Sequence, residues 1–438
     1  MMQLSKQRSR DILNALRRGT VPEESLDAFA VGLDRFEVAL DEELRDAKQG
    51  QGQFKAVRGE YGCGKTFFAR WLADRARKLG FATAEVQISE TETPLHRMET
   101  VYRRLNERLR TAECCDGAFR NVIDNWFLAL EQDVLSECSG EELPDRELFQ
   151  RTNELFETRL RKLGDSAQVF SLALRGYRQA QAQSDRGTAD AILAWLAGQP
   201  NVAAAAKRAA GVKGDIDHFG ASASIKGLLT VLRDSGYAGL LLVLDEVETV
   251  QRMRSDVRQK CLNALRQLLD DVDGGQFPGL YLVVTGTSGF FTGPQGVRSL
   301  EPLAQRLHVE FDSDPQFDNP RMPQIRLAPF NLERLCEVGG RVRDIHCSLA
   351  GAAERVRSRC DDHYIRGLAD AIAGQLGGKV GTAPRIFLKK LVDVLDRVDQ
   401  YEAFDPGRDF AVKIDQSEMT TSERHAAAGS VDEVELEL

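Results

Sequence analysis

The chain has 438 residues, of which 42% are hydrophobic and 29% are charged, a composition typical of soluble globular proteins with two or three domains. Its net charge of −9 excludes non-specific nucleic-acid binding by the chain as a whole. No apolar run approaches the roughly 20 residues of a membrane span, and no apolar signal core is present, so we expect a cytoplasmic protein without a membrane partner.

Two amphipathic helices are expected in an N-terminal segment, residues 1–48. Apolar side chains recur at helical spacing over residues 5–18 and again over residues 35–45. Gly19 and Pro22 end the first helix. A short glycine-containing link then leads to a first strand and to the core domain, which we place at residues 49–328.

Residues 59–66 match the phosphate-loop pattern G-x-x-x-x-G-K-[ST] without a mismatch, between an apolar strand and an apolar-rich helix. The glycines allow backbone N–H groups to turn toward phosphates, while Lys65 reaches the β/γ oxygens and Thr66 holds Mg²⁺. A glycine-rich turn with a chance Lys-Thr pair is the structural alternative. The predicted ATP contacts are Gly59, Glu60, Tyr61, Gly62, Cys63, Gly64, Lys65, Thr66 and Phe67.

An adenine pocket is expected in the N-terminal segment. The residues before the first strand of such folds commonly supply apolar and backbone contacts to the base. The candidates are Val21, Pro22, Val31 and Gly32. Simple loop packing explains these residues equally well.

A helical block occupies about residues 112–235, after a second strand at residues 82–88. The apolar run 240–244 follows this block and reads as a strand buried on both faces. Because one crossover between parallel strands needs only some 30 residues, the helical block is predicted to be an insertion.

Two adjacent acids, Asp245 and Glu246, end this buried strand. Beside a phosphate loop, Asp245 would join the Mg²⁺ coordination shell while Glu246 polarises the attacking water. Two solvated acids at a strand end are the alternative. The eight cysteines show no C-x-x-C pair and no zinc spacing, so we predict reduced thiols and no metal site besides the Mg²⁺ site.

Thr285 and Thr287 end another buried strand, at residues 279–287, and either side chain can contact the γ-phosphate or the water. Hydrogen bonding to neighbouring backbone is equally open. Arg306 precedes an expected strand at residues 308–311, where a subunit can offer a guanidinium to its neighbour's nucleotide. An ordinary surface arginine is the alternative for this residue.

Residues 329–402 are predicted to form a C-terminal helical lid, after a last strand near residues 325–327. Arg385 lies at a helix N-terminus, where the helix dipole disfavours a cation that has no anion to meet, so we assign it as a phosphate contact. The tail, residues 403–438, is expected to be largely disordered.

Two arginine-rich clusters interrupt this acidic chain. They are Arg103, Arg104, Arg108 and Arg110 in the first and Arg252, Arg254, Arg258 and Lys260 in the second. Each fits a solvated helix face or a nucleic-acid surface.

Taken together, these motifs resemble the AAA+ class, especially its origin-recognition and STAND branches. The resemblance implies an α/β fold: a P-loop core with a mostly parallel sheet, a large helical insertion and a C-terminal helical lid. At finer grain the chain resembles the BrxD-like ATP-binding proteins of BREX-type phage-defence systems. The matching segments are residues 15–19, 21–22, 31–32, 57–62, 94–96, 101–102, 236–240 and 244–248.

This resemblance implies a component of a multi-protein antiviral system that acts beside a helicase, with DNA as the target. The first functional hypothesis is a homo-oligomeric Mg²⁺-ATPase that remodels a DNA-bound defence complex. The second is a nucleotide switch that binds ATP tightly, turns over slowly and recruits a partner. The third is a small-molecule kinase, but the sequence shows no evident motif for a substrate pocket.

Overall fold

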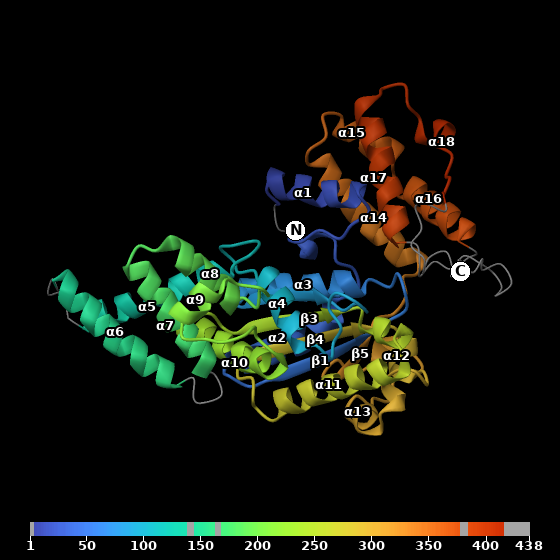
Figure 1. Ribbon diagram of the computed structural model, residues 1–438. Helices are drawn as coiled ribbons and strands as arrows, with labels where there is room; N and C mark the ends of the chain where they lie inside the picture. Colours follow the sequence, from blue (N-terminus) through green and yellow to red (C-terminus); the bar gives the residue numbers. More distant parts are fainter. Residues whose placement is uncertain (1–3, 138–143, 163–167, 377–383, 416–438) are drawn as a thin grey trace.

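A five-stranded parallel sheet lies at the centre of the computed structural model, which describes residues 4–137, 144–162, 168–376 and 384–415 (Figure 1). Its strand order is β2-β3-β4-β1-β5. The strands are β1 (Gln53–Arg58), β2 (Ala82–Gln87), β3 (Leu240–Asp245), β4 (Leu280–Gly286) and β5 (Gln324–Arg326). Because all pairings are parallel, the carboxyl ends of these strands share one edge of the sheet.

The two faces of the sheet support separate hydrophobic cores, because successive side chains of a strand point to opposite faces. Leu241 and Val243 face the core that contains α2 (Asp34–Lys48) and α3 (Lys65–Lys78). Leu242 and Leu244 face the core that contains α4 (Met98–Glu107), α10 (His218–Asp234) and α11 (Ser255–Asp273). This burial on both sides explains why β3 and β4 read as continuous apolar runs.

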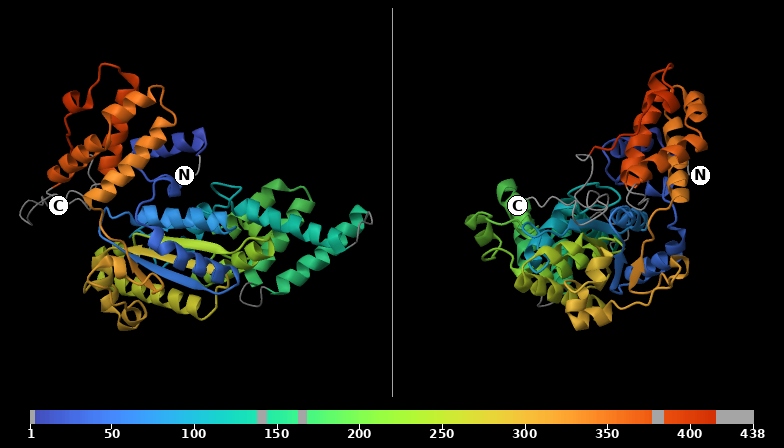
Figure 2. Two further views of the ribbon diagram at one scale, coloured as in Figure 1. Left: turned by 180° about the vertical axis from the view of Figure 1, so that it is seen from behind. Right: turned by 90° about the vertical axis from the view of Figure 1, so that its right-hand side faces the viewer.

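Further helices between β2 and β3 extend to one side of the sheet (Figures 1 and 2). They are α5 (Phe119–Glu137), α6 (Asp145–Lys162), α7 (Gln168–Ala182), α8 (Arg186–Leu196) and α9 (Ala204–Ala209). Trp126 of α5 packs against Phe156 of α6 with ring centroids 5.5 Å apart. None of the helices in the described ranges combines the length and the hydrophobicity that a bilayer crossing requires.

A second group of helices lies over the sheet near the phosphate loop (Figure 2). It contains α14 (Leu332–Cys347), α15 (Ala353–Arg359), α16 (Asp362–Gln375), α17 (Pro384–Gln400) and α18 (Pro406–Asp409). Helix α1 (Lys6–Arg17) joins this group, since Arg17 Nε lies 2.7 Å from Asp396 of α17. Within the N-terminal segment, α1 packs against the C-terminal helices and α2 packs against the sheet.

One sequence-based expectation requires correction. Residues 308–311 form no strand, and Phe311 instead lies under the guanidinium groups of Arg58 and Arg326, at 5.5 and 5.0 Å from its ring centroid. Part of the expected tail, residues 403–415, contains α18, and Phe404 and Phe410 there pack against the C-terminal helices. The rest of that tail, residues 416–438, lies outside the described residues, as do residues 377–383 before α17.

Candidate functional site

The phosphate loop connects β1 to α3, and its glycines are required by its geometry. Gly62 and Gly64 have φ values of +79° and +93°, which side chains with a Cβ rarely adopt. A Cβ on Gly59 would lie 2.3 Å from the Cys63 sulfur, so that position has no room for a side chain. Helix α3 then begins without a side-chain cap, which leaves its first N–H groups available to an anion.

The side chains of Cys63 and Lys65 are both buried inside the loop. Burial raises the pKa of the Cys63 thiol to about 11, so it stays neutral where a thiolate would repel phosphate. Lys65 Nζ donates to the carbonyl oxygens of Gly59 at 3.0 Å and Glu60 at 3.3 Å. It also lies 3.9 Å from Glu248, whose pKa is raised by burial and whose Oε2 has no hydrogen-bond partner.

Thr66 and Asp245 meet at the carboxyl edge of the sheet. The Thr66 hydroxyl donates to Asp245 Oδ2 at 3.0 Å, and the Thr285 hydroxyl donates to Oδ1. A hydroxyl and a carboxylate are the oxygen ligands that Mg²⁺ takes alongside phosphate oxygens and water. The described residues contain no cluster of three His, Cys, Asp or Glu side chains that could hold another metal. Because Thr66 supplies the hydroxyl and Asp245 the carboxylate, these two residues fit the predicted Mg²⁺ site.

Glu246 follows Asp245 in an unusual backbone conformation, with φ at +58°. Its side chain accepts a hydrogen bond from Gln87 Nε2 at 2.8 Å. The contact arises from register, because Gln87 at the end of β2 lies opposite Asp245 at the end of β3. Gln87 was not predicted from the sequence, although a polar residue ending the neighbouring strand was a usable signal.

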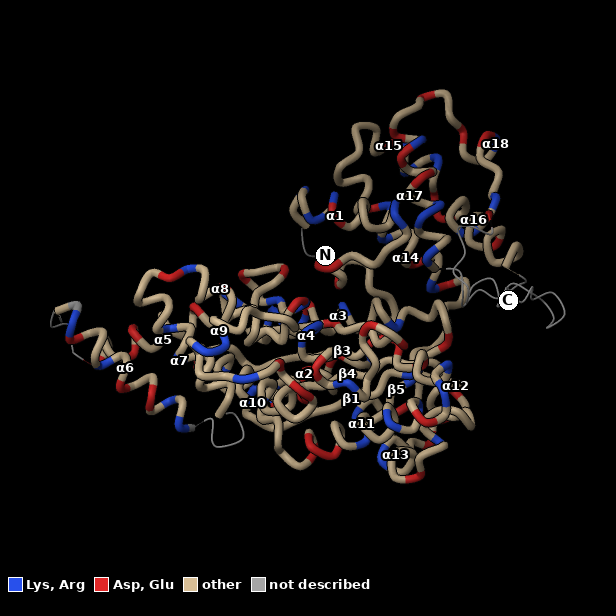
Figure 3. The backbone as a smooth tube through the Cα atoms, viewed as in Figure 1, with Lys and Arg blue, Asp and Glu red and all other residues tan. Residues whose placement is uncertain are grey.

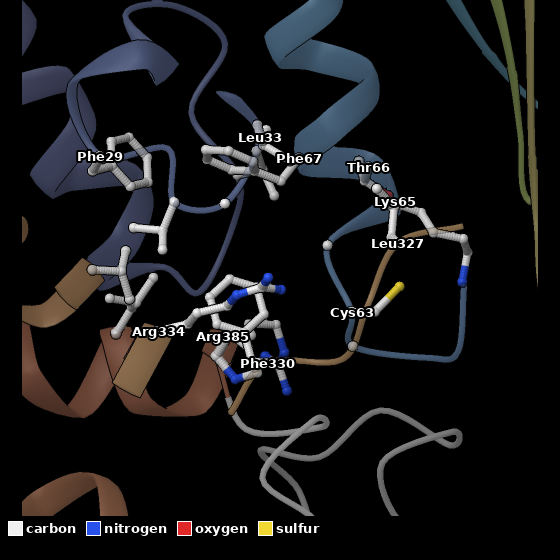
Figure 4. A pocket seen from close by; sticks show the side chains of 18 of the residues that line it. Phe29, Leu33, Cys63, Lys65, Thr66, Phe67, Leu327, Phe330, Arg334 and Arg385 are labelled. Atoms are coloured by element: carbon white, nitrogen blue, oxygen red, sulfur yellow. The ribbon is translucent and has the colours of Figure 1, made fainter. Parts of the chain in front are cut away.

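A cavity of about 420 Å³ extends from the phosphate loop to the N-terminal segment and the C-terminal helices (Figure 4). Such a volume is typical of small-molecule sites. All four adenine-pocket candidates line it, and so do the predicted loop residues 61–67. Phe29 and Phe67 add an apolar wall, with ring centroids 5.2 Å apart. Contact between the four candidates and a base remains a prediction.

Two arginines from different helices also line this cavity (Figure 4). Arg385 is the second residue of α17, and a Cβ on Gly19 would lie 3.2 Å from its Nη1. Arg334 is the third residue of α14, and a Cβ on Gly32 would lie 3.1 Å from its Cζ. The two glycines thus make room for two cations at one end of the cavity. Arg385 was predicted from the sequence and Arg334 was not.

A family model described as BREX system ATP-binding protein BrxC/D matches residues 4–413. The chain belongs to this family. No curated protein matches the sequence. Membership in the BrxC/D family supports ATP binding and a role in phage defence as part of a multi-protein system.

Three predicted catalytic residues, Thr285, Thr287 and Arg306, lie outside the described lining of the cavity, although Thr285 contacts Asp245 at its edge. Thr287 accepts a hydrogen bond from Phe290 N and so caps α12 (Ser288–Thr292). Arg306 ends α13 (Glu301–Arg306) and pairs with two α11 acids, Asp270 at 2.5 Å and Asp273 at 3.0 Å. Within one chain, Thr287 has a local structural role and Arg306 is held away from the nucleotide cavity.

Proposed function

We propose that the chain is a Mg²⁺-dependent ATPase of the AAA+ class that acts in BREX-type defence. The single observation that carries this proposal is the meeting of Thr66 and Asp245 beside the phosphate loop. These residues come from α3 and β3, so their contact assembles a metal-ligand pair from distant segments. Glu246, next in the chain, supplies a carboxylate at the same edge.

Each side chain has a defined task in this proposal. The loop N–H groups and Lys65 bind the phosphates after Lys65 leaves the carbonyl oxygens of Gly59 and Glu60. When bound, Mg²⁺ neutralises phosphate charge. Glu246 orients the attacking water and accepts its proton, which requires that its carboxylate exchange Gln87 for water. Arg385 and Arg334 contact phosphate from the C-terminal helices, which act as a lid.

The cellular setting extends the proposal. The protein works in the cytoplasm as a homo-oligomer and remodels a DNA-bound defence complex, beside a partner such as a helicase. Arg306 reaches a neighbour's nucleotide only after its pairs with Asp270 and Asp273 break. Oligomer assembly would therefore control hydrolysis.

A nucleotide switch with slow turnover is the second candidate. Two contacts favour it: Lys65 binds the loop's own carbonyls, and Glu246 is held by Gln87. A protein with both groups restrained binds ATP and hydrolyses it slowly until a partner changes these contacts.

One set of measurements separates the two candidates. ATP turnover is measured with no DNA, with duplex and with single-stranded DNA, together with sedimentation in ATP. A motor loses turnover on Arg306→Ala, and mixing that variant with Glu246→Gln subunits restores part of it, because each supplies what the other lacks. A monomeric switch shows neither effect. Absence of turnover under every condition contradicts the ATPase proposal.

A further inference from the structure

A second cavity lies at the edge of the sheet beside β2, and residues of α3 and α4 line it. Its volume is about 510 Å³. The arginines that line it are Arg70, Arg77, Arg104, Arg108 and Arg110. Only three acids, Glu23, Glu85 and Glu92, line it with them, so the cavity has an excess of two positive charges in a chain of net charge −9.

This excess is local. Lysine and arginine alternate with aspartate and glutamate along most of the elements, so the surface as a whole is mixed in charge (Figure 3). Three of the four arginines in the first cluster of the sequence converge here with Arg70 and Arg77 of α3. Arg110 is fixed at this edge by backbone hydrogen bonds of 2.8 Å in both directions with Thr83 of β2.

The ion pairs of the cavity use its three acids and also Asp74 and Glu107 nearby, and they leave Arg108 as the arginine of the described lining without a partner. Arg70 pairs with Glu85 at 2.8 Å and Arg110 with Glu23 at 2.9 Å. Arg104 pairs with both Glu92 at 2.7 Å and Glu107 at 2.8 Å. The guanidinium of Arg77 pairs with Asp74, 3.5 Å away on the same helix, and burial lowers the pKa of this guanidinium. Arg108 is exposed, and the described residues offer its guanidinium no ion pair or hydrogen bond.

We propose that this cavity is a second anion site, which binds the phosphate groups of a polyanionic ligand. Guanidinium groups bind phosphate oxygens through pairs of parallel hydrogen bonds. The hydroxyls of Ser89, Thr91 and Thr93 add neutral donors. No aromatic side chain is present among the described residues that line the cavity, so it offers phosphate recognition without base stacking. The source is a nucleic-acid backbone or a free polyphosphate.

The cavity is distinct from the nucleotide cavity but shares a wall with it. Gln87 lines the second cavity and donates to Glu246 of the first. Arg70 also lines the second cavity and donates to the carbonyl oxygen of Val21, which lines the first. A phosphate bound beside β2 would therefore lie close to the ATPase residues without occupying their site.

The test uses the full-length Lys65→Ala variant, in which the nucleotide loop is impaired. Binding of a fluorescently labelled single-stranded oligonucleotide is followed by anisotropy over a range of salt concentrations, with tripolyphosphate as competitor. Arg108→Ala and Arg108→Glu are compared with Arg208→Ala on α9. Arg208 is a matched control, because it too is exposed and its guanidinium has no partner among the described residues.

Arg108→Ala is expected to weaken oligonucleotide binding about tenfold, as the loss of one charge-assisted hydrogen bond does. Because one phosphate contact is lost, the slope of log K against log salt becomes less steep by about 0.7. Arg108→Glu weakens binding further, and Arg208→Ala does not change it. If tripolyphosphate displaces the oligonucleotide, the site is assigned to free polyphosphates. If the oligonucleotide stays bound in the presence of tripolyphosphate, the site is assigned to a nucleic-acid backbone.

Three outcomes overturn the proposal. In the first, the Arg108 variants bind the oligonucleotide as tightly as their parent. In the second, Arg208→Ala weakens binding as much as Arg108→Ala does. In the third, Lys65→Ala alone removes binding, which would place the phosphates in the phosphate loop. ATP titration of the Arg108 single variants is expected to match the wild type. The result is therefore independent of whether the chain hydrolyses ATP.

Discussion

The Thr66 hydroxyl donates to the Asp245 carboxylate at 3.0 Å, although the two residues lie 179 positions apart in the chain. The strand order explains the contact, because β4 alone separates β1, which leads to the phosphate loop, from β3, which ends at Asp245. Both strands finish at the same edge of the sheet. The long helical region between them changes their separation in sequence but not in space.

Glu246→Gln is expected to retain ATP binding and to slow hydrolysis by about 10²- to 10⁴-fold, the usual contribution of a general base. The amide preserves the size of the side chain and its contact with Gln87 but cannot accept the proton. Single-turnover hydrolysis and ATP titration check both parts. Hydrolysis at the parent rate would show that Glu246 is not the base.

Gln87→Ala is expected to raise turnover several-fold without changing the affinity for ATP. The amide of Gln87 occupies the Glu246 carboxylate, so its removal leaves this carboxylate free to orient the attacking water. Gln87→Glu serves as a second variant, since it removes the donor while preserving the length of the side chain. A tenfold fall in turnover for both variants would mean that Gln87 holds Glu246 in its active position.

Glu43→Ala is expected to destabilise the fold by about 3 kcal/mol, because it leaves a buried charge without its partner. Lys55 is 1% exposed and its ammonium lies 2.6 Å from Glu43, which also accepts from the Tyr281 hydroxyl. The neighbouring Glu42 is a control, since its pair with Arg321 is largely exposed and is worth about 1 kcal/mol or less. Urea unfolding measures both changes. Equal costs would contradict this account of the buried pair.

Asp396 is expected to make stability depend on pH in the acid range. Burial alone would raise its pKa, but hydrogen bonds from Arg17 and His346 outweigh burial and lower the pKa to about 2. Because the folded value lies below the ordinary value of about 3.9, the contribution is present above pH 4 and is lost as pH falls toward 2. It amounts to about 2 kcal/mol.

The measurement for this prediction is urea unfolding of Asp396→Asn at several pH values. The variant is expected to be less stable than the wild type above pH 4, with the difference shrinking below it. Asp393→Asn on the same helix is the control, since its pair with Arg397 is about half exposed. A constant difference across the range would contradict the predicted pKa.

The parallel sheet and the phosphate loop were predictable because each leaves a local mark on the sequence. Strands buried on both faces appear as apolar runs, and the loop needs glycine at fixed positions. Strand β5 is short and leaves a weaker pattern. The alternation of polar and apolar residues over 308–311 is typical of a strand, although no strand forms there. There the apolar side chain of Phe311 is instead covered by two guanidinium groups.

The rest of the site depends on tertiary contacts that no local pattern encodes. Gln87 matters because parallel register places it beside the two acids, and Arg334 because α14 starts at the cavity. The amphipathic pattern of α1 indicated a buried face but not its partner, α17. Glu248 follows the two acids by two positions, and only the tertiary fold shows that it is buried beside Lys65.

The most direct test of the central claim is isothermal titration of the wild type and Lys65→Ala with ATP, in Mg²⁺ and in EDTA. Circular dichroism of both proteins shows that each is folded. We predict saturable binding by the wild type that weakens without Mg²⁺, and loss of binding by Lys65→Ala. Equal affinity of the two proteins for ATP, or no affinity in either, would contradict a nucleotide site at this loop.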